Sequence, residues 1–230
     1  VLDLVKKKTD LLVGAVMDDP VIHARTKGVG ILTKEDILNF AAVGPTARAS
    51  GVDMDVRRDD PYAAYPLVNW KVITAQAGDV FAKAEVRLLE MYESISIIEQ
   101  CLEGLQKEKE GDVQVKVKFI PEGYGTGHAE APRGEVFHFV VSDGSNSPAR
   151  HKIRAPSYTN ISTFKKSCVG QSISDATISL AAVDPCYCCT ERLAVALDRN
   201  NGKRLMNARE IIAHSSEITK SLLQLHNHIK

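Results

Sequence analysis

Long hydrophobic runs, an even set of cysteines and a net charge are all missing from this chain of 230 residues. The longest apolar runs fall well short of the roughly 18 residues that a membrane-spanning helix needs, and we find no secretory signal. Basic and acidic residues number 29 each, so a basic face for nucleic acid is not expected. Because the 5 cysteines are odd in number and clustered, they fit reduced thiols of the cytosol better than a disulfide scaffold.

What the chain does have is a cluster of cysteines toward its C-terminal end. Cys186, Cys188 and Cys189 lie within four positions, and Cys186 and Cys189 form a Cys-x-x-Cys pair. Pro185 fixes the backbone before the first thiol, so we expect a rigid loop that aims two sulfurs at one soft metal. Structural zinc usually takes four ligands from two such pairs, and the sequence holds no second pair. Either partner ligands come from outside this chain, as in a shared zinc site, or the pair works as a redox dithiol.

Hydrophobic periodicity predicts a mainly helical fold with a small β part. The clearest signal is an apolar stripe from Phe81 through Leu88, Ile95, Ile98 and Leu102 to Leu105, which predicts a long helix in the core of a bundle, with Asp79 as its N-cap. Other helices are expected at 1–18, 37–42 (with Thr33 and Asp36 as a capping box), 160–167, 172–182 and 207–229. Strands are expected at 113–119, 134–141, 149–154 and 191–198, and an ordered loop at 44–65.

The motif Asp184-Pro185-Cys186-x-x-Cys189-x-x-Arg192 resembles the C-terminal signature of nickel–iron hydrogenase large subunits. The arginine at its last position, where many uptake enzymes carry histidine, resembles the membrane-bound, energy-converting and formate-hydrogenlyase branch. Further matches follow in the order of the family, at 19–21, 25–30, 44–51, 55–57, 61–65, 130–135 (Glu-Ala-Pro-Arg-Gly-Glu) and 152–157. The resemblance therefore extends over most of the chain, and the quinone-site subunit of complex I shares the same architecture.

The resemblance implies a nickel–iron centre whose iron carries CO and cyanide ligands. Cys186 would be a terminal nickel ligand and Cys189 a bridging one, whereas Cys188 falls outside the ligand positions and is expected to be an incidental thiol. Such a centre takes four thiolates, so two must come from elsewhere.

Four other residues acquire roles from the same resemblance. Arg133 would hold a fixed positive charge over the open coordination position, and Asp184 would pair with it and keep its orientation. Pro132 would pack against the diatomic ligands, and Ser157 would donate a hydrogen bond to a cyanide. Simpler roles stay open: a surface arginine for Arg133, a loop-entry aspartate for Asp184 and a helix-capping serine for Ser157.

The family's large subunit is about twice as long and carries its other Cys-x-x-Cys in the N-terminal half. Because the residues after Val1 are already helical in pattern, we expect the chain to begin inside a longer subunit. Residues 1–192 would be the C-terminal portion of that subunit, with a β insertion at about 113–155. Residues 193–230 would be an extension that a maturation protease removes once nickel chaperones have loaded the metal.

The activity that the resemblance implies is reversible reduction of protons to dihydrogen. Cys101 and Cys168 stand alone and cannot bind clusters, so an iron–sulfur small subunit is implied as the electron partner. Membrane subunits of a complex I-like assembly would hold the chain at the inner face of the cytoplasmic membrane. Three alternatives stay open: a complex I-like subunit with a changed substrate, a sulfur-reducing or antiporter-linked relative, and a noncatalytic scaffold that binds an iron–sulfur partner.

Overall fold

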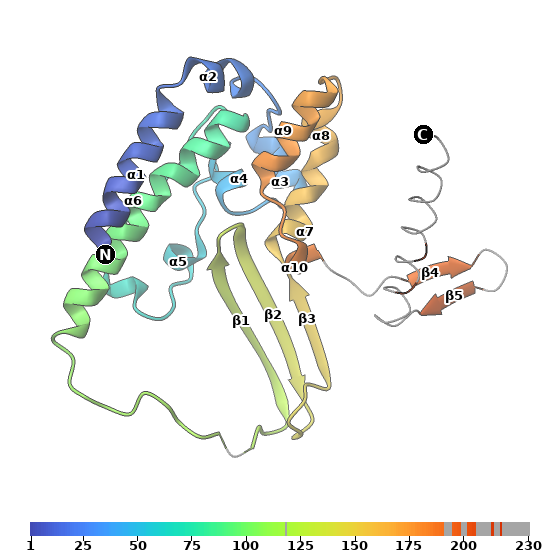
Figure 1. Ribbon diagram of the computed structural model, residues 1–230. Helices are drawn as coiled ribbons and strands as arrows, with labels where there is room; N and C mark the ends of the chain where they lie inside the picture. The colour runs from blue at the N-terminus through green and yellow to red at the C-terminus, as the bar shows by residue number, and fades with distance from the viewer. Residues whose placement is uncertain (118, 191–194, 199–201, 206–212, 214–216, 218–230) are drawn as a thin grey trace. The chain divides into compact units, whose positions relative to one another are not determined.

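A computed structural model describes residues 1–117, 119–190, 195–198, 202–205, 213 and 217. The chain divides into two compact units, Val1–Thr190 and Glu191–Lys230. In the first unit the helices gather at one end of a three-stranded sheet (Figure 1). None of the helices within these ranges is long and apolar enough to cross a membrane. The expected mainly helical fold with a small β part is confirmed.

The elements of the first unit follow one another along the chain as follows. The helices are α1 (Leu2–Met17), α2 (Pro20–Thr26), α3 (Lys34–Phe40), α4 (Pro45–Arg48), α5 (Val56–Asp59), η1 (Tyr65–Leu67) and α6 (Val80–Leu105). The antiparallel sheet has the order β1 (Gly123–Ala131), β2 (Gly134–Ser142), β3 (Arg150–Arg154). After it come α7 (Pro156–Asn160), η2 (Ile161–Thr163), α8 (Phe164–Cys168), α9 (Ile173–Val183) and α10 (Tyr187–Thr190).

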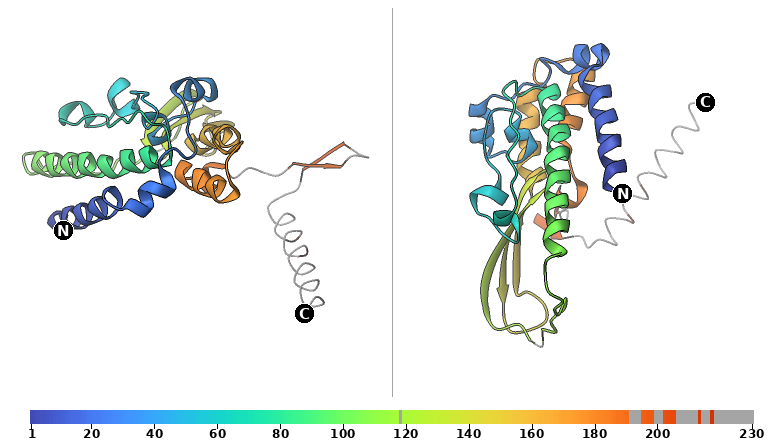
Figure 2. Two further views of the ribbon diagram at one scale, coloured as in Figure 1. Left: turned by 90° about the horizontal axis from the view of Figure 1, so that it is seen from above. Right: turned by 90° about the vertical axis from the view of Figure 1, so that its left-hand side faces the viewer.

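Helix α6 is the long helix that the apolar stripe predicts, and its N-cap is Asp79, whose side chain accepts a hydrogen bond from the Ala82 amide at 2.7 Å. Helix α1 lies along it (Figure 2). The first half of the stripe, including Phe81 and Ile95, is buried as expected. The second half is not, because Ile98, Leu102 and Leu105 are 45%, 47% and 67% exposed. The prediction of bundle core is therefore wrong for the last turns of α6, which no described element covers.

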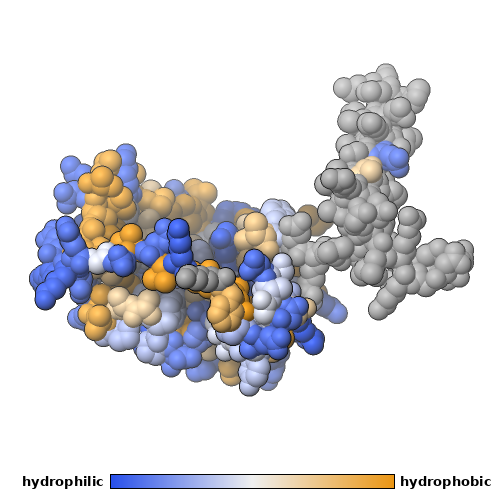
Figure 3. Space-filling view, turned by 90° about the horizontal axis from the view of Figure 1, so that it is seen from below, coloured by the Kyte–Doolittle hydropathy of each residue, from blue (hydrophilic) through white to orange (hydrophobic). Residues whose placement is uncertain are grey.

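The sheet differs from the expected one at its first strand. The alternating valines at 113–117 predict a strand, but this segment has no regular structure, and Val113, Val115 and Val117 are exposed. Alternation stabilises a strand only when a neighbouring strand and a core are present to receive it, and β1 pairs with β2 alone. Figure 3, which views the molecule from below, shows apolar side chains exposed among hydrophilic ones on this face of the first unit. Strand β1 itself was not predicted, because its alternating glycines are weak strand formers.

The expected hairpin is confirmed: β2 and β3 pair antiparallel, with Phe137 opposite Arg154. The capping box of Thr33 and Asp36 is present too, at the start of α3. The predicted loop at 44–65 is only partly right, because Pro45 begins α4 and Asp55 caps α5. Of these two short helices, α4 packs against α6 and α5 against β1.

In the second unit, β4 (Val195–Asp198) pairs antiparallel with β5 (Gly202–Leu205). The strand β4 lies within the expected strand at 191–198. Of the expected helix at 207–229 the structure describes only residues 213 and 217, both helical, and Arg192 of the cysteine motif lies outside the described residues.

Candidate functional site

The tight turn between β1 and β2 presents Arg133 to the end of α9. Gly134 follows it with a φ of +127°, and Gly44 approaches the turn so closely that a Cβ on Gly44 would lie 2.4 Å from the Arg133 carbonyl oxygen. Asn160 supports the same turn, because its Nδ2 donates to that carbonyl oxygen at 3.0 Å. Three separate segments therefore determine where the arginine side chain begins.

The guanidinium of Arg133 makes a two-pronged ion pair with Asp184, the residue that ends α9. Its Nε lies 2.8 Å from Oδ2 of Asp184 and its NH2 nitrogen 2.9 Å from Oδ1, and Nε also donates to the Asp184 backbone oxygen at 3.1 Å. The paired carboxylate raises the pKa of Arg133 further above its ordinary value. This two-point geometry fixes the plane of the guanidinium, which lysine could not reproduce.

Asp184 reaches this position through an unusual backbone conformation. Its φ of +56° and ψ of +60° place it in the left-handed region, where a helix normally ends with glycine or asparagine. The cost for a residue with a side chain is about 1 kcal/mol or more. The hydrogen bonds to Arg133 offset that cost. Strain of this kind is concentrated at functional sites.

The two motif cysteines follow immediately. Pro185 ends the turn, Cys186 precedes α10 and Cys189 lies within it, so the motif is one short helical turn as well as a loop. The expected loop is correct for Pro185 and Cys186 only. Both thiols are free, and the backbone N–H of Cys189 donates to the Cys186 carbonyl oxygen at 3.1 Å. The closed turn places both thiols near enough to Arg133 for each to act on the pKa of its guanidinium.

The surroundings treat the two thiols differently. Hydrogen bonding from the Cys189 backbone amide is the largest influence lowering the pKa of Cys186, and the charge of Arg133 acts in the same direction. Burial is the largest influence raising the pKa of Cys189, and the neighbouring Cys186 adds to it. Thiolates bind soft metals and thiols do not, so Cys186 is the better prepared ligand.

Ser157 lies beneath this turn and is fully buried at the start of α7. Its Oγ accepts a hydrogen bond from the Cys186 backbone N–H at 3.1 Å, and its hydroxyl proton remains available as a donor on the side of the thiols. Hydrogen bonds donated by the hydroxyl and the backbone N–H of Ser157 work to lower the pKa of Cys189. The serine therefore touches the backbone of one cysteine and the side chain of the other.

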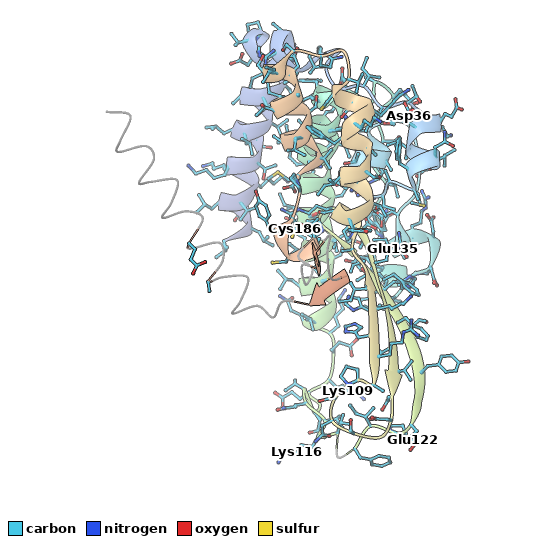
Figure 4. All side chains as sticks on the ribbon, turned by 90° about the vertical axis from the view of Figure 1, so that its right-hand side faces the viewer. Asp36, Lys109, Lys116, Glu122, Glu135 and Cys186 are labelled. Atoms are coloured by element: carbon cyan, nitrogen blue, oxygen red, sulfur yellow. The ribbon has the colours of Figure 1, made fainter. Side chains whose placement is uncertain are left out.

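Pro132, the remaining predicted residue, is exposed on the hairpin turn and lines an open cavity with Asp184. The cavity measures about 460 Å³, and α1 and α6 form its other walls, through residues that include Val5, Met91 and Ile95. Figure 4 shows Cys186 at the helical end of the sheet together with Glu135, whereas Lys109, Lys116 and Glu122 lie at the opposite end. The structure therefore brings all six predicted residues together where the sheet meets the helices.

Sequence reasoning missed two charged residues of α6 that lie against the site. The Arg87 guanidinium donates to the Val183 backbone oxygen at 3.4 Å and to the Lys83 backbone oxygen at 2.8 Å. Burial lowers the pKa of Arg87, while Asp184 acts to raise it. One turn further, Glu90 lines the 460 Å³ cavity. In the sequence, the signal for Arg87 and Glu90 is two charged residues, three positions apart, that flank the apolar stripe of α6.

A buried charge cluster lies on the other side of Glu90. Arg48, only 2% exposed, contacts Glu90 at 2.6 Å, Glu130 at 2.9 Å and Asp55 at 3.2 Å. Burial raises the pKa of Glu130 against the opposing effect of Arg48. Glu130 and His128 also line a second cavity of about 240 Å³. Through its contact with Arg48, Glu130 thus supports the β1–β2 hairpin that carries Arg133.

Residues 1–121 and 112–192 match the family described as respiratory-chain NADH dehydrogenase, 49 Kd subunit. The chain belongs to this family. Over 173 residues it is 41% identical to an NADH-quinone oxidoreductase subunit from Clostridium beijerinckii, a match that covers 74% of this chain and 46% of that protein. Over 239 residues it is 30% identical to the membrane-bound hydrogenase subunit alpha of Pyrococcus furiosus, covering 96% and 56%. The resemblance to the hydrogenase and complex I group is therefore confirmed.

A solved structure from a respiratory complex shares the fold. It is the membrane-bound sulfane sulfur reductase, an archaeal respiratory membrane complex, with a TM-score of 0.75 and 29% identity, over 80% of this chain and 52% of that one. The chain spans about half the length of the curated relatives it matches. The two relatives are named as oxidoreductase or hydrogenase subunits, and the solved structure is named as a respiratory membrane complex.

The donor set fits part of the nickel–iron centre that the resemblance implies. Two thiols in one turn, with an arginine and a buried hydroxyl beside them, suit two of the four thiolate positions. Within the described residues no group of three or more His, Cys, Asp or Glu side chains could hold a metal alone. The residues present therefore fit half of such a centre.

Proposed function

We propose that this chain is the C-terminal part of a nickel–iron hydrogenase catalytic subunit, which reduces protons to dihydrogen reversibly. Cys186 and Cys189 supply two thiolates to a nickel–iron centre with CO and cyanide ligands on iron, and a further segment supplies the other two. Electrons pass to an iron–sulfur partner subunit. Membrane subunits of a complex I-like assembly hold the protein at the inner face of the cytoplasmic membrane.

One observation carries this proposal: the thiol turn and the Arg133–Asp184 ion pair meet at one place. The quinone-site subunit of complex I has no use for two thiols at this place. It lacks the cysteine pair and typically has lysine at the position of Arg133. In the two-pronged ion pair, Nε of Arg133 lies 2.8 Å from Oδ2 of Asp184. Such a pair suits a guanidinium whose positive charge must keep one orientation.

The chain's own residues would act as follows. Nickel and iron, when bound, supply the redox chemistry for splitting or forming dihydrogen. Cys186 would be the thiolate that takes up or releases the proton at its sulfur. Arg133 presents fixed N–H donors to the open side of the centre, and Asp184 keeps them there. Ser157 positions the Cys186 backbone and would donate its hydroxyl proton to a cyanide.

A second candidate is sulfur reduction. It is favoured by the likeness to the sulfane sulfur reductase, with its TM-score of 0.75. The same thiol turn would then hold a metal centre that acts on a sulfur chain. The two candidates differ in substrate while requiring the same residues.

The decisive experiment uses the complete subunit, co-produced with its maturation proteins. Nickel and iron content and the infrared bands of metal-bound CO and cyanide are measured together with dihydrogen evolution and sulfur reduction. Cys186→Ser and Cys189→Ser should each abolish the metal centre. Cys188→Ser, on the same turn but exposed, is the matched control and should retain it.

The possible outcomes separate the candidates. Dihydrogen evolution with a nickel–iron signal supports the first proposal, and sulfur reduction without dihydrogen evolution supports the second. A complete subunit that holds neither nickel nor iron at Cys186 and Cys189 overturns both and leaves a quinone-site subunit or a noncatalytic scaffold. Mass spectrometry of the nickel-loaded form also tests whether residues 193–230 are removed; the boundary between the two compact units at Thr190 supports such a cut.

A further inference from the structure

Two histidines on neighbouring strands face each other on one face of the sheet. His138 lies on β2 and His151 on β3, and Nδ1 of His138 lies 2.8 Å from Nε2 of His151. Their ring centroids are 5.1 Å apart, with the planes inclined by 32°. The register pairs His138 with Ile153 and Val140 with His151, so the histidines are diagonal neighbours across the ladder. Their spacing is therefore determined by strand pairing and not by a loop.

The third histidine of the sheet shows a different environment. His128 has Glu135 at 3.2 Å from its Nδ1 and Asp60 at 3.3 Å from its Nε2, so both ring nitrogens already have carboxylate partners. His138 and His151 instead use one nitrogen each on the other. At most one proton lies between those two nitrogens, so one of them donates and the lone pair of the other accepts.

The face beside the pair is open. The β1 residue opposite His138 is Gly127, and the one opposite Val140 is Gly125. A Cβ added at either glycine would meet no atom within 4 Å. An ion held by the two histidines would therefore have room for further ligands over the glycines.

Imidazole nitrogen is a preferred ligand of Zn²⁺, Ni²⁺ and Cu²⁺. Metal–nitrogen bonds of about 2.0–2.1 Å place two neighbouring ligands of a square-planar or octahedral ion about 2.9 Å apart. The 2.8 Å separation of the two ring nitrogens nearly matches that requirement. An ion can thus replace the shared proton without a change in the separation of the two nitrogens, while each ring turns by about 45° so that its lone pair points at the ion.

We propose that His138 and His151 form a two-histidine surface site for a divalent transition-metal ion. Across the part of the chain that the structure describes, no group of three or more metal-ligating side chains occurs, so water fills the other coordination positions. The bound ion clamps β2 to β3. The site lies apart from the cysteine turn and does not depend on the proposed function.

The test uses the 230-residue chain with competing ligands removed. Cys186, Cys188 and Cys189 are changed to serine, and His226 and His228 to alanine. Cu²⁺, Ni²⁺ and Zn²⁺ are titrated separately by calorimetry, and the copper complex is examined by electron paramagnetic resonance. One ion per chain is expected, with Cu²⁺ bound more tightly than Ni²⁺ or Zn²⁺, and with two imidazole nitrogens in the copper spectrum.

The variants His138→Ala and His151→Ala should each weaken binding by about tenfold or more, because one of two protein ligands is lost. His128→Ala is the matched control and should change nothing. Equal affinity in all three variants, binding only at millimolar ion concentrations, or a copper spectrum with fewer than two imidazoles overturns the proposal. If a variant fails to fold, the copper spectrum of the chain with both His138 and His151 intact still shows whether two imidazoles bind the ion.

Discussion

Asn160 donates a hydrogen bond from its side-chain nitrogen to the backbone oxygen of Arg133 at 3.0 Å. The same amide group accepts from the Val43 backbone N–H at 2.9 Å and donates to the Val43 backbone oxygen at 3.2 Å. Asn160 is fully buried. One side chain at the end of α7 therefore joins the arginine turn to the loop before α4.

Asn160→Ala should lower the free energy of unfolding by about 3 kcal/mol, because three hydrogen bonds of about 1 kcal/mol each are lost and buried backbone groups are left unpaired. Urea denaturation measures this change. Asn146→Ala, at an exposed position of the turn between β2 and β3, is the control and should change stability by less than about 0.5 kcal/mol. Equal losses in the two variants would show that the amide of Asn160 carries no special contact.

Two glycines with similar positive φ values differ in their surroundings. Gly28 and Gly44 have φ values of +74° and +69°, but a Cβ on Gly28 meets nothing within 4 Å, whereas one on Gly44 meets the Arg133 carbonyl oxygen at 2.4 Å. Gly28→Ala should cost about 1–2 kcal/mol for the left-handed backbone alone. Gly44→Ala should cost about 1–3 kcal/mol more, because its ψ of −150° is open essentially to glycine alone and because backbone atoms must move apart. Thermal unfolding of the two variants gives the comparison, and indistinguishable melting temperatures would refute the close approach.

The thiols of the cysteine turn should react in a set order. Since the pKa of Cys186 is lowered and that of Cys189 raised, the thiolate of Cys186 is populated at lower pH, and iodoacetamide should modify it first. Peptide mapping after brief alkylation across a pH series measures the order. Arg133→Gln should move the Cys186 midpoint to higher pH, because the charge that favours the thiolate is gone. Modification of Cys189 ahead of Cys186 would contradict this assignment.

Lys83 is fully buried, and its Nζ donates to the backbone oxygens of Gly30 at 2.8 Å and Gly78 at 2.9 Å. Burial lowers the pKa of Lys83 from 10.5 to about 8. Between these two values the unfolded chain binds more protons than the folded one, so stability should rise with pH across that window and stay level below it. The full rise corresponds to about 3 kcal/mol.

Lys83→Met should remove this rise, and Lys71→Met, at an exposed position, should leave it in place. Urea titrations of the unaltered chain and both variants, from about pH 7 to the ordinary lysine value of 10.5, provide the measurement. A slope that survives in Lys83→Met would assign the pH dependence to another group.

Much of the helical framework was accessible from local pattern. Asp79 and the stripe that begins at Phe81 specify α6, since capping and 3.6-residue periodicity act within one segment. The capping box of Thr33 and Asp36 is local in the same way. The alternating valines at 113–117 predicted a strand that does not form. A strand needs a partner strand, and a short stretch of sequence does not show whether a partner is present.

The sequence by itself determined which chemical groups the site contains: a thiol pair after a proline, an arginine between proline and glycine, and a serine after another proline. Only the tertiary structure decided that they meet. The ion pair of Arg133 and Asp184 joins residues 51 positions apart, and it forms because Asp184 adopts a left-handed backbone while Gly44 and Asn160 support the hairpin turn. Contacts between distant segments depend on packing and on backbone strain that other parts of the fold offset, and neither is encoded in local periodicity.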